Sequence, residues 1–287
     1  MAMLDLIAQC WPGPVYAATV DHQLRVESAA EAAMVAAFCA DADMRHAILR
    51  PEEPITGSVQ AAARRARYAL LSEEADRVGA SWIVTAHHAD DQLETVLMRL
   101  ARGSGVDGLA GVRSRNGRVI RPMLGWTKAE LLHHCKMREL PFADDPTNRN
   151  ADFDRVRMRT ALVEFTAIEP LNAVRSAQAL ADVADALYWV VEREAASVVA
   201  RREDAIELHA AGYPDALLRR LVQRCLEHIQ PGIAPRGAAL DRLIDILRSG
   251  GQGMIGNILC RGGDVWCFTR APARHKAKPT AHGTDNS

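Results

Sequence analysis

The amino-acid sequence predicts an α/β protein with a Rossmann-like parallel sheet, a helical second domain and a short C-terminal hairpin. In the first half, short apolar runs alternate with helical periodicity in the order αβαβαβα. This is the order of a parallel sheet covered by helices. In the second half helical periodicity dominates, and two short apolar runs flank Arg261-Gly262-Gly263-Asp264, which predicts a hairpin.

The elements of the first half follow from apolar periodicity and from capping residues. Pro12-Gly13-Pro14 ends the first helix, and Ser28 and Thr127, each followed three residues later by Glu, are typical of capping boxes. The expected elements are helices at 1–9, 28–40, 58–77, from about 91 to 100 and from 127 to about 140, and strands at 15–20, 45–49, 82–85 and 119–120.

The sequence changes in character after about residue 166. Residues 170–210 have the periodicity of one long amphipathic helix, which two further helices and the hairpin strands follow. The basic, polar tail is typical of disorder. We expect four segments: an α/β domain at 1–165, a helical domain at 166–230, a small helix and hairpin at 231–270 and a disordered tail at 271–287.

The amino-acid composition is that of a globular protein. Of the 287 residues 48% are hydrophobic and 25% charged, as in a globular protein with a substantial core. The sequence has neither a membrane-length apolar run nor a signal peptide, and its six cysteines form no C-x-x-C pair, so we expect a cytoplasmic protein with reduced thiols. The net charge of -1 means that nucleic-acid binding would depend on local arginine clusters.

The stretch from Trp82 to Gly105 is the strongest candidate for a functional site. An apolar run ending at Thr85 is followed by His87, His88, Asp90 and Asp91, and then by a helix. Ligands of open α/β sheets bind at the carboxyl ends of strands, where helix N-termini lie. Asp91 with Glu94 is also typical of an N-cap and its capping box, which would explain one carboxylate but not two histidines and a second aspartate.

Further clusters have both a functional and a purely structural interpretation. A glycine-rich loop after the site helix could approach a phosphate, but taken alone it favours simple turns. Arginines around residues 119–120 and before residue 160 suit either phosphate contacts or a solvated surface, and an acidic cluster near residue 145 is also an ordinary turn. The residues are Gly103, Gly105, Gly108 and Gly111; Arg113, Arg115, Arg118 and Arg121; Asp144 and Asp145; and Arg155, Arg157 and Arg159.

Six strings that occur in order resemble those of the tRNA(Ile)-lysidine synthetase family, in the PP-loop ATP pyrophosphatase group. They are V-D-H-Q-L-R-V-E-S-A-A-E-A at 20–32, A-R-R-A-R-Y at 63–68, T-A-H-H-A-D-D-Q-L-E-T at 85–95, R-G-S-G-V-D-G-L at 102–109, I-R-P-M-L at 120–124 and D-D-P-T-N at 144–148. The resemblance covers residues 1–165 most strongly. It implies an adenine nucleotide alpha hydrolase-like fold for them, a tRNA- and substrate-recognition role for the helical segment, and is compatible with a homodimer.

The resemblance also implies a reaction, with ATP and Mg²⁺ as cofactors and tRNA(Ile) with a CAU anticodon and free L-lysine as partners. The carbonyl oxygen of the wobble cytidine attacks the α-phosphate of ATP and pyrophosphate leaves. The ε-amine of lysine then displaces AMP, which gives lysidine. Because charge builds on phosphoryl oxygens, such a site needs cationic groups, amides and carboxylates that hold magnesium.

The family's roles carry over residue by residue. Asp91, with Asp90 as an alternate, would serve magnesium or lysine activation, His87 or His88 would contact phosphate or the target base, and Arg155 would stabilise the adenylate. Asp144 and Asp145 would bind the lysine ammonium. The other residues implied are His22, Asp90, Arg102, Gly103 and Gly105 for ATP, and Arg64, Arg67, Tyr68, Glu94, Arg121 and Asn148 for substrate.

The sequence departs from the family pattern in two places. Val156 stands where the family has Asn after the arginine, and the S-G-G-x-D-S loop with the strand before it does not occur. The sequence begins one residue past the expected position of that loop, which predicts either a true start further upstream or a degenerate relative without ATP chemistry; intact later motifs favour the first.

Two other functions fit parts of the sequence. A protein that binds tRNA without catalysis would use the same arginines. Another PP-loop tRNA-modifying enzyme, such as a thiolase, would need the paired cysteines that are typical of that class, and the sequence has none.

Overall fold

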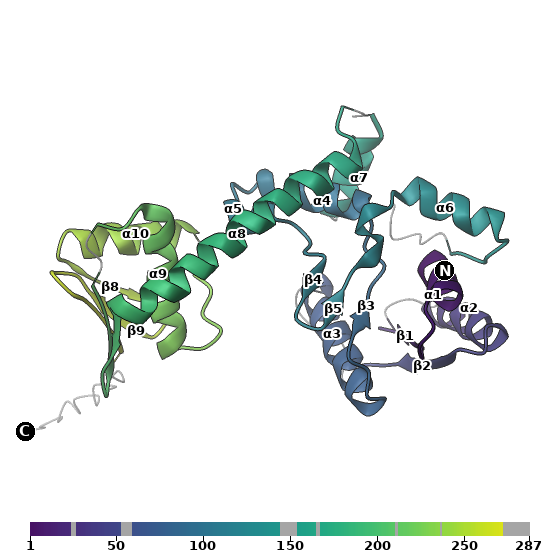
Figure 1. Ribbon diagram of the computed structural model, residues 1–287, viewed down its shortest axis with the longest axis horizontal. Helices are drawn as coiled ribbons and strands as arrows, with labels where there is room; N and C mark the ends of the chain where they lie inside the picture. Colours follow the sequence, from purple (N-terminus) through teal and green to yellow (C-terminus); the bar gives the residue numbers. More distant parts are fainter. Residues whose placement is uncertain are drawn as a thin grey trace, which may run out of the picture. The chain divides into compact units, whose positions relative to one another are not determined.

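A computed structural model describes residues 1–23, 27–52, 59–143, 154–164, 167–209, 212–235 and 237–271 (Figure 1). The predicted tail beyond residue 271 lies outside these ranges. The chain divides into two compact units, Met1–Ala184 and Asp185–Ser287, with the boundary inside a long helix. No helix in the described ranges is long and apolar enough to span a membrane.

Unit 1 contains the predicted alternation of strands and helices. Its elements are α1 (Ala2–Cys10), β1 (Tyr16–Val20), α2 (Glu27–Asp41), β2 (Arg45–Leu49), α3 (Val59–Arg77), β3 (Ile83–Val84), α4 (Ala89–Leu100), α5 (Val106–Leu109), β4 (Arg115–Asn116), β5 (Val119–Ile120), the 3-10 turn η1 (Pro122–Gly125), α6 (Lys128–Met137), α7 (Asp154–Glu164) and the first part of α8 (Pro170–Val198).

The parallel strands of unit 1 form two ladders. β1 pairs with β2 in parallel, and β3 pairs with β5 in parallel, with β4 antiparallel on the far side of β5. Helix α3 contacts both β1 and β3, so the ladders lie beneath the same helix. Within the described residues β1 and β3 each have one strand neighbour, and the ladders are not joined. The predicted α/β class with parallel strands is confirmed.

Packing in unit 1 centres on β1 and α2. Ala17, Cys39 and Met44 are buried, with Leu4, Val15, Val35 and Phe38 packed against them. Cys39 is fully buried because the end of α2 closes over it, and the backbone N–H of Met44 donates to its carbonyl at 2.7 Å. This small cluster holds β1 and β2 in register, and their carboxyl ends carry Asp21 and Arg50.

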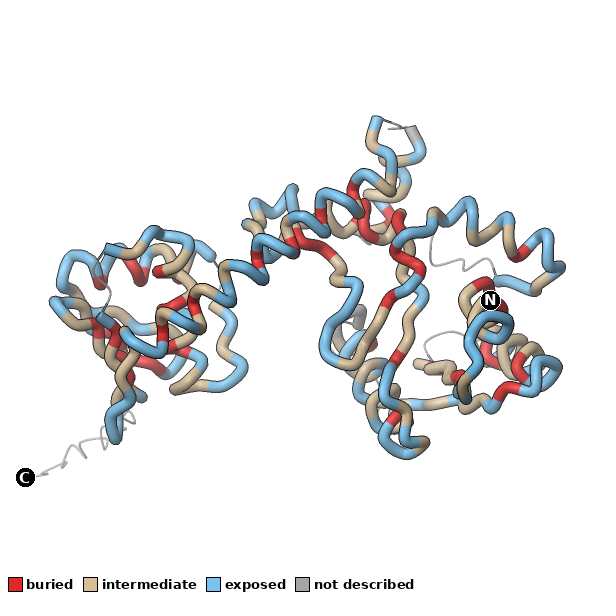
Figure 2. The backbone as a smooth tube through the Cα atoms, viewed as in Figure 1, coloured by how far each residue is buried: buried red, intermediate tan, exposed pale blue. Residues whose placement is uncertain are grey.

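Unit 2 is built on a five-stranded antiparallel sheet in the order β6-β7-β10-β9-β8. After the end of α8 come β6 (Val199–Arg201), β7 (Ala205–Leu208), α9 (Asp215–Ile229), α10 (Gly237–Arg248), β8 (Gln252–Ile255), β9 (Ile258–Arg261) and β10 (Trp266–Arg270). Figure 2 shows the buried residues of this unit gathered where α9 and α10 meet the sheet. The predicted C-terminal hairpin is present as β9 and β10.

The predicted helix over residues 170–210 is too long. Helix α8 ends at Val198, and the chain returns through β6 and β7. Burial alternates along β7, and Ile206 and Leu208 lie in the core, as expected for a strand. The alanine-rich sequence before β7 has helical periodicity, so the start of the strand could not be recognised from the sequence. Because β7 pairs with β10, residues 205–208 share a sheet with residues 266–270.

The six cysteines are free thiols, four of them buried. Burial raises the pKa of Cys225 and of Cys260 to about 12, so both sulfurs remain protonated and pack as small apolar groups. Cys10 in unit 1 is exposed and Cys267 in β10 is half-buried.

Candidate functional site

The predicted site lies where β3 and β5 end and α4 begins. The N–H of Thr85 continues the β3–β5 ladder by donating to Ile120 at 3.0 Å, and Arg121 follows β5 directly. Parallel strands end at the same edge of a sheet, so residues 85–91 and residue 121 converge there. The strand therefore delivers two histidines and two carboxylates to the N-terminus of α4, as the sequence predicted.

Helix α4 begins one turn earlier than the predicted cap. The N-cap is His88, in an extended conformation, and Asp91 is the third helical residue, whose Oδ2 accepts from the backbone N–H of His88 at 3.1 Å. The purely structural alternative, with Asp91 as the N-cap and Glu94 as its box partner, is not what forms: Asp91 is the box partner of His88. Because Asp91 takes the role expected of Glu94, the Glu94 carboxylate is available for contacts elsewhere.

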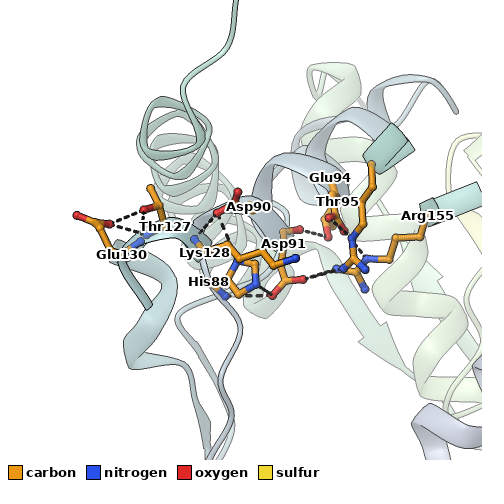
Figure 3. Close-up of polar contacts among 10 residues, drawn as sticks. His88, Asp90, Asp91, Glu94, Thr95, Thr127, Lys128, Glu130 and Arg155 are labelled. Atoms are coloured by element: carbon orange, nitrogen blue, oxygen red, sulfur yellow. Dashed lines mark hydrogen bonds and ion pairs between the residues drawn. The ribbon is translucent and has the colours of Figure 1, made fainter. Parts of the chain in front are cut away.

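Asp90 ties α4 to the start of α6. Its Oδ2 accepts from the backbone N–H of Lys128 at 2.7 Å and lies 3.5 Å from His88 Nδ1 (Figure 3). Burial raises the pKa of the Asp90 carboxyl, but hydrogen bonds from His88 and Lys128 outweigh it and hold the pKa below its usual value. Asp90 is thus an ionised carboxylate at the junction of the two helices.

Asp91 and Glu94 on α4 face Arg155 and Arg159 on α7, and we call these four residues the α4–α7 ion cluster. Arg155 donates from Nε to Glu94 Oε2 at 2.7 Å and from Nη2 to Asp91 Oδ1 at 3.1 Å (Figure 3). Arg159 donates from Nε to Glu94 Oε1 at 2.5 Å, and its Nη2 lies 3.7 Å from Asp91 Oδ1. Two residues spaced by one helical turn on each helix produce this match.

Val156, the departure from the family motif, is buried at 7% exposure. Its side chain belongs to the packing of α7, while Arg155 and Arg159 leave the helix on the side of α4. The apolar residue at position 156 therefore does not displace Arg155 from the site.

His87 is a neutral base at physiological pH. Its pKa is lowered to about 4, chiefly by burial; the negative charge of Asp91 raises it, and the positive charges of Arg121, Arg64 and Arg155 lower it. Its Nδ1 lies 3.1 Å from Thr85 Oγ1. A neutral imidazole among three guanidinium groups suits a site that receives an anion, because the arginines retain their charge while the ring serves as a hydrogen-bonding group.

Arg121 is buried, at 5% exposure, so it does not stand in a solvent-facing row with the other arginines. Its Nη1 donates to Arg113 O at 2.8 Å and its Nη2 to the Tyr68 hydroxyl at 3.3 Å. Arg64 stacks on the Tyr68 ring, 5.0 Å from its centroid. Arg121 lies between β5 and η1, and the alternation of side chains along the extended backbone points it inward. Arg64 and Tyr68 lie on α3, where Tyr68 contacts Arg121.

The other predicted phosphate contacts lie apart from Arg121. Arg118 pairs with Asp76 at the end of α3 and with the carbonyl of Ala80 in the turn that follows. Arg115 stacks over the exposed Trp82 ring at 4.6 Å from its centroid. The interpretation as a solvated surface therefore fails for Arg121; contact of the four arginines with phosphate stays a prediction.

The glycine-rich loop folds back onto α4. Arg99 donates from Nη1 to the carbonyls of Gly108, at 2.5 Å, and Gly111, at 3.1 Å. Gly111 has a φ of +64°, and a Cβ there would lie 2.5 Å from Gln92 Oε1, which accepts from Val112 N at 2.6 Å. These contacts are structural. Phosphate binding by Arg102, Gly103 and Gly105 stays a prediction.

His22 follows β1 at the carboxyl end of the first ladder. Among the described residues neither of its buried ring nitrogens has a hydrogen-bond partner, and burial together with the charge of Arg67 lowers its pKa. The neighbouring Asp21 is fully engaged, accepting from Ser28 Oγ at 2.7 Å and from Gln23 N at 2.9 Å. A nucleotide-binding role for His22 stays a prediction.

A magnesium site is not preformed. In the described part of the chain no three His, Cys, Asp or Glu side chains gather as metal ligands, and Asp91 Oδ1 faces two guanidinium groups. Asp144, Asp145 and Asn148 lie outside the described residues. The sequence named Arg159 only as one of three arginines that suit phosphate contacts or a solvated surface, and its ion pairs with Asp91 and Glu94 were not predicted.

Comparisons with known proteins show similarity to PP-loop proteins. The family model of the PP-loop domain matches residues 1–166. The chain is 38% identical to the tRNA(Ile)-lysidine synthase of Zymomonas mobilis over 273 residues, with 92% of this chain and 83% of the relative covered. It is 40% identical to that of Novosphingobium aromaticivorans over 281 residues, with 95% and 86% covered.

A solved structure is similar in fold. It is the U34-tRNA thiolase NcsA from Methanococcus maripaludis, with a TM-score of 0.51, 14% identity, and 62% of this chain and 67% of that chain covered. At this identity the match supports the fold alone. Family membership rests on the two synthases and the PP-loop domain, which confirm the resemblance in the six strings: this chain belongs to the tRNA(Ile)-lysidine synthase family of PP-loop proteins.

Proposed function

We propose that the protein joins lysine to the wobble cytidine of a tRNA(Ile) with a CAU anticodon, at the expense of ATP. The observation that carries the proposal is the α4–α7 ion cluster beside His87, in a chain that aligns with lysidine synthases over more than nine-tenths of its length. Two guanidinium groups and two carboxylates at the ends of parallel strands suit a reaction that builds and removes phosphoryl charge.

The proposed reaction has two balanced steps. The cytidine O2 attacks the α-phosphorus of ATP, and pyrophosphate leaves with the electron pair of the broken P–O bond. The lysine ε-amine then attacks C2 of the activated ring, AMP leaves with the oxygen, and the amine loses a proton. ATP supplies the leaving group; the protein's residues bind, orient and neutralise charge.

Each described residue has a place in this scheme. Arg155 stabilises the phosphoryl oxygens, and neutral His87 donates or accepts a hydrogen bond at the phosphate or the target base. The unsatisfied ring of His22 takes a polar edge of adenine. The tRNA contacts Arg64, Arg67 and Tyr68 on α3. Arg121 positions Tyr68 by donating a hydrogen bond to its hydroxyl.

Asp90 and Asp91 supply negative charge for the cationic partners, lysine and Mg²⁺. Asp91 is the better placed, because Asp90 already accepts from Lys128 N, while the contact of Asp91 with Arg155 Nη2 is one that another cation can take over. Because no three candidate ligands gather among the described residues, most of the Mg²⁺ ligands would be phosphate oxygens and water.

AMP release tests the proposal. We expect release with tRNA(Ile) bearing CAU and lysine together, and none with the same tRNA bearing UAU or without lysine. Equal turnover of unrelated tRNAs would overturn the lysidine assignment. Retention of the tRNA on a filter without any ATP consumption would instead favour a protein that only binds tRNA.

A further inference from the structure

The two carboxylates of the α4–α7 ion cluster contact the arginines differently: Glu94 binds their Nε atoms, and Asp91 faces their Nη2 atoms. We propose that Glu94 is a positioning residue, which holds the two arginines by their Nε atoms so that Arg155 can exchange Asp91 for a phosphate oxygen. The inference rests on the proposed function, because Arg155 is the group assigned to the phosphoryl oxygens.

Glu94 has no free oxygen with which to bind substrate. Its side chain is 5% exposed, and its Oε2 and Oε1 accept from Nε of Arg155 at 2.7 Å and of Arg159 at 2.5 Å. Both oxygens are thus already engaged with arginines, and the burial of the side chain leaves little of the carboxylate open to a substrate ammonium. The buried carboxylate therefore serves the arginines, and the more exposed Asp91 is left to meet ligands.

The choice of Nε matters for the geometry. The guanidinium is a planar, rigid group, so a hydrogen bond at Nε also fixes the direction in which its Nη atoms point. The Nη2 atoms of Arg155 and Arg159 both point toward Asp91 Oδ1, at 3.1 and 3.7 Å. Both arginines are thus anchored at one end and face the N-terminus of α4 at the other, where His87 and His88 lie.

This arrangement couples two events. The cluster contains two carboxylates and two guanidinium groups, so it is neutral as it stands. When a phosphate oxygen takes Arg155 Nη2, Glu94 keeps Nε in place and Asp91 loses its closest cation. Asp91 is then left with a negative charge for the ammonium of the second substrate, so anion binding prepares the site for the cation.

The positioning itself is tested without turnover, by the arginine Nε–H signals in nuclear magnetic resonance spectra of the full chain. We expect slowly exchanging Nε–H signals from Arg155 and Arg159, assigned with Arg155→Lys and Arg159→Lys, which disappear or shift in Glu94→Gln. Glu74→Gln is the matched control, because Glu74 accepts two bonds from Arg77 at 2.7 Å on the outside of α3. Unchanged Arg155 and Arg159 signals in Glu94→Gln would overturn the proposal.

The kinetic consequence is a loss of turnover rather than of tRNA affinity. Displacing a guanidinium by about an ångström is expected to lower kcat about 100-fold in Glu94→Gln, while KM for tRNA changes less than about threefold. Glu94→Asp, which keeps the charge but is too short to reach both arginines, should recover only part of the rate. Glu74→Gln should retain the wild-type rate.

A double-mutant cycle separates positioning from direct contact. If Glu94 acts through Arg155, then Glu94→Gln combined with Arg155→Lys should lose little more than the larger single loss. Multiplicative losses would mean that Glu94 contacts substrate itself, which overturns the proposal. Protected Nε–H signals in a protein that never releases AMP would overturn the proposed function while leaving the positioning contacts in place.

Discussion

Asp5 of α1 and His134 of α6 are joined side chain to side chain, with Oδ2 and Nε2 2.7 Å apart, although 129 residues separate them. Arg138, one turn further along α6, lies 3.4 Å from the same carboxylate oxygen, and Gln9 donates to it at 2.6 Å. Asp5 is buried, so this contact anchors the first helix to the helix whose N-terminus holds Asp90.

We therefore expect Asp5→Asn to destabilise unit 1 by about 1–3 kcal/mol at pH 7, because it removes the charge that three donors share. Burial raises the pKa of Asp5, but hydrogen bonds from His134 and Arg138 outweigh it and lower the pKa below 3.8. The stabilisation is thus present above about pH 4 and is lost as the pH falls through the lowered value. Urea unfolding at pH 7 and pH 3 measures both effects, with Asp264→Asn in an exposed loop as control; equal losses at the two pH values would contradict the assignment.

Gly111 is expected to be the least replaceable glycine of the loop after α4. Gly111→Ala combines a φ of +64° with a Cβ 2.5 Å from Gln92 Oε1, whereas Gly103→Ala has a φ of +67° and no atom within 4 Å. We expect a cost of about 1 kcal/mol for backbone strain in both, with a further loss in Gly111→Ala from the broken Gln92–Val112 contact. Thermal unfolding compares the pair directly. If the two variants melt alike, the close packing of this loop on α4 does not contribute.

His87 should remain neutral down to about pH 4, since burial and three arginines disfavour its charged form. Its lowered folded pKa means that stability is fully present above the unfolded value, near 6.5, and falls as the pH decreases toward 4. His87→Gln should flatten the pH dependence of unfolding in that window, while His209→Gln at an exposed position should not. A nuclear magnetic resonance titration that places the His87 midpoint near 6.5 would refute the buried, cation-flanked environment.

The arginines around β5 should behave differently in tRNA binding. Arg115→Ala should reduce the slope of log affinity against log salt by about one if that side chain meets a phosphate. Arg121→Ala should leave the slope unchanged and lower the melting temperature, because Arg121 is buried against Arg113 and Tyr68. Filter binding over a range of salt concentrations, paired with thermal unfolding, tests both. A slope that falls for Arg121→Ala and not for Arg115→Ala would reverse this assignment.

Local patterns predicted the parts of the fold that local forces determine. The strand at Ile83 and the helix after it follow from apolar periodicity, and Thr127 caps α6 with Glu130 as predicted, since the two residues satisfy each other within one turn. The sequence placed the start of α4 near Asp91, whereas the helix is capped by His88. The difference arises because aspartate is a common N-cap and histidine is a rare one.

Tertiary contacts determined what the sequence could not. The partnership of Glu94 with Arg159 joins residues 65 positions apart, and no short-range pattern encodes it. Arg121 and Arg118 have the same side-chain chemistry, yet pleating of β5 turns one inward and leaves the other at the surface. Strand β7 was absorbed into the predicted long helix because only its pairing with β10 reveals it.

Local unfolding of unit 2 can be followed through its two buried thiols, Cys225 and Cys260. A sulfur whose pKa is raised to about 12 is almost entirely unreactive toward alkylating agents at neutral pH, because the thiolate is the nucleophile. Cys225 on α9 and Cys260 on β9 lie in the same core, so labelling of either records its exposure to solvent. Cys10, exposed in unit 1, reacts without any opening and provides an internal standard in the same molecule. The time course of modification would therefore read the local unfolding of the C-terminal sheet with no substitution in the chain.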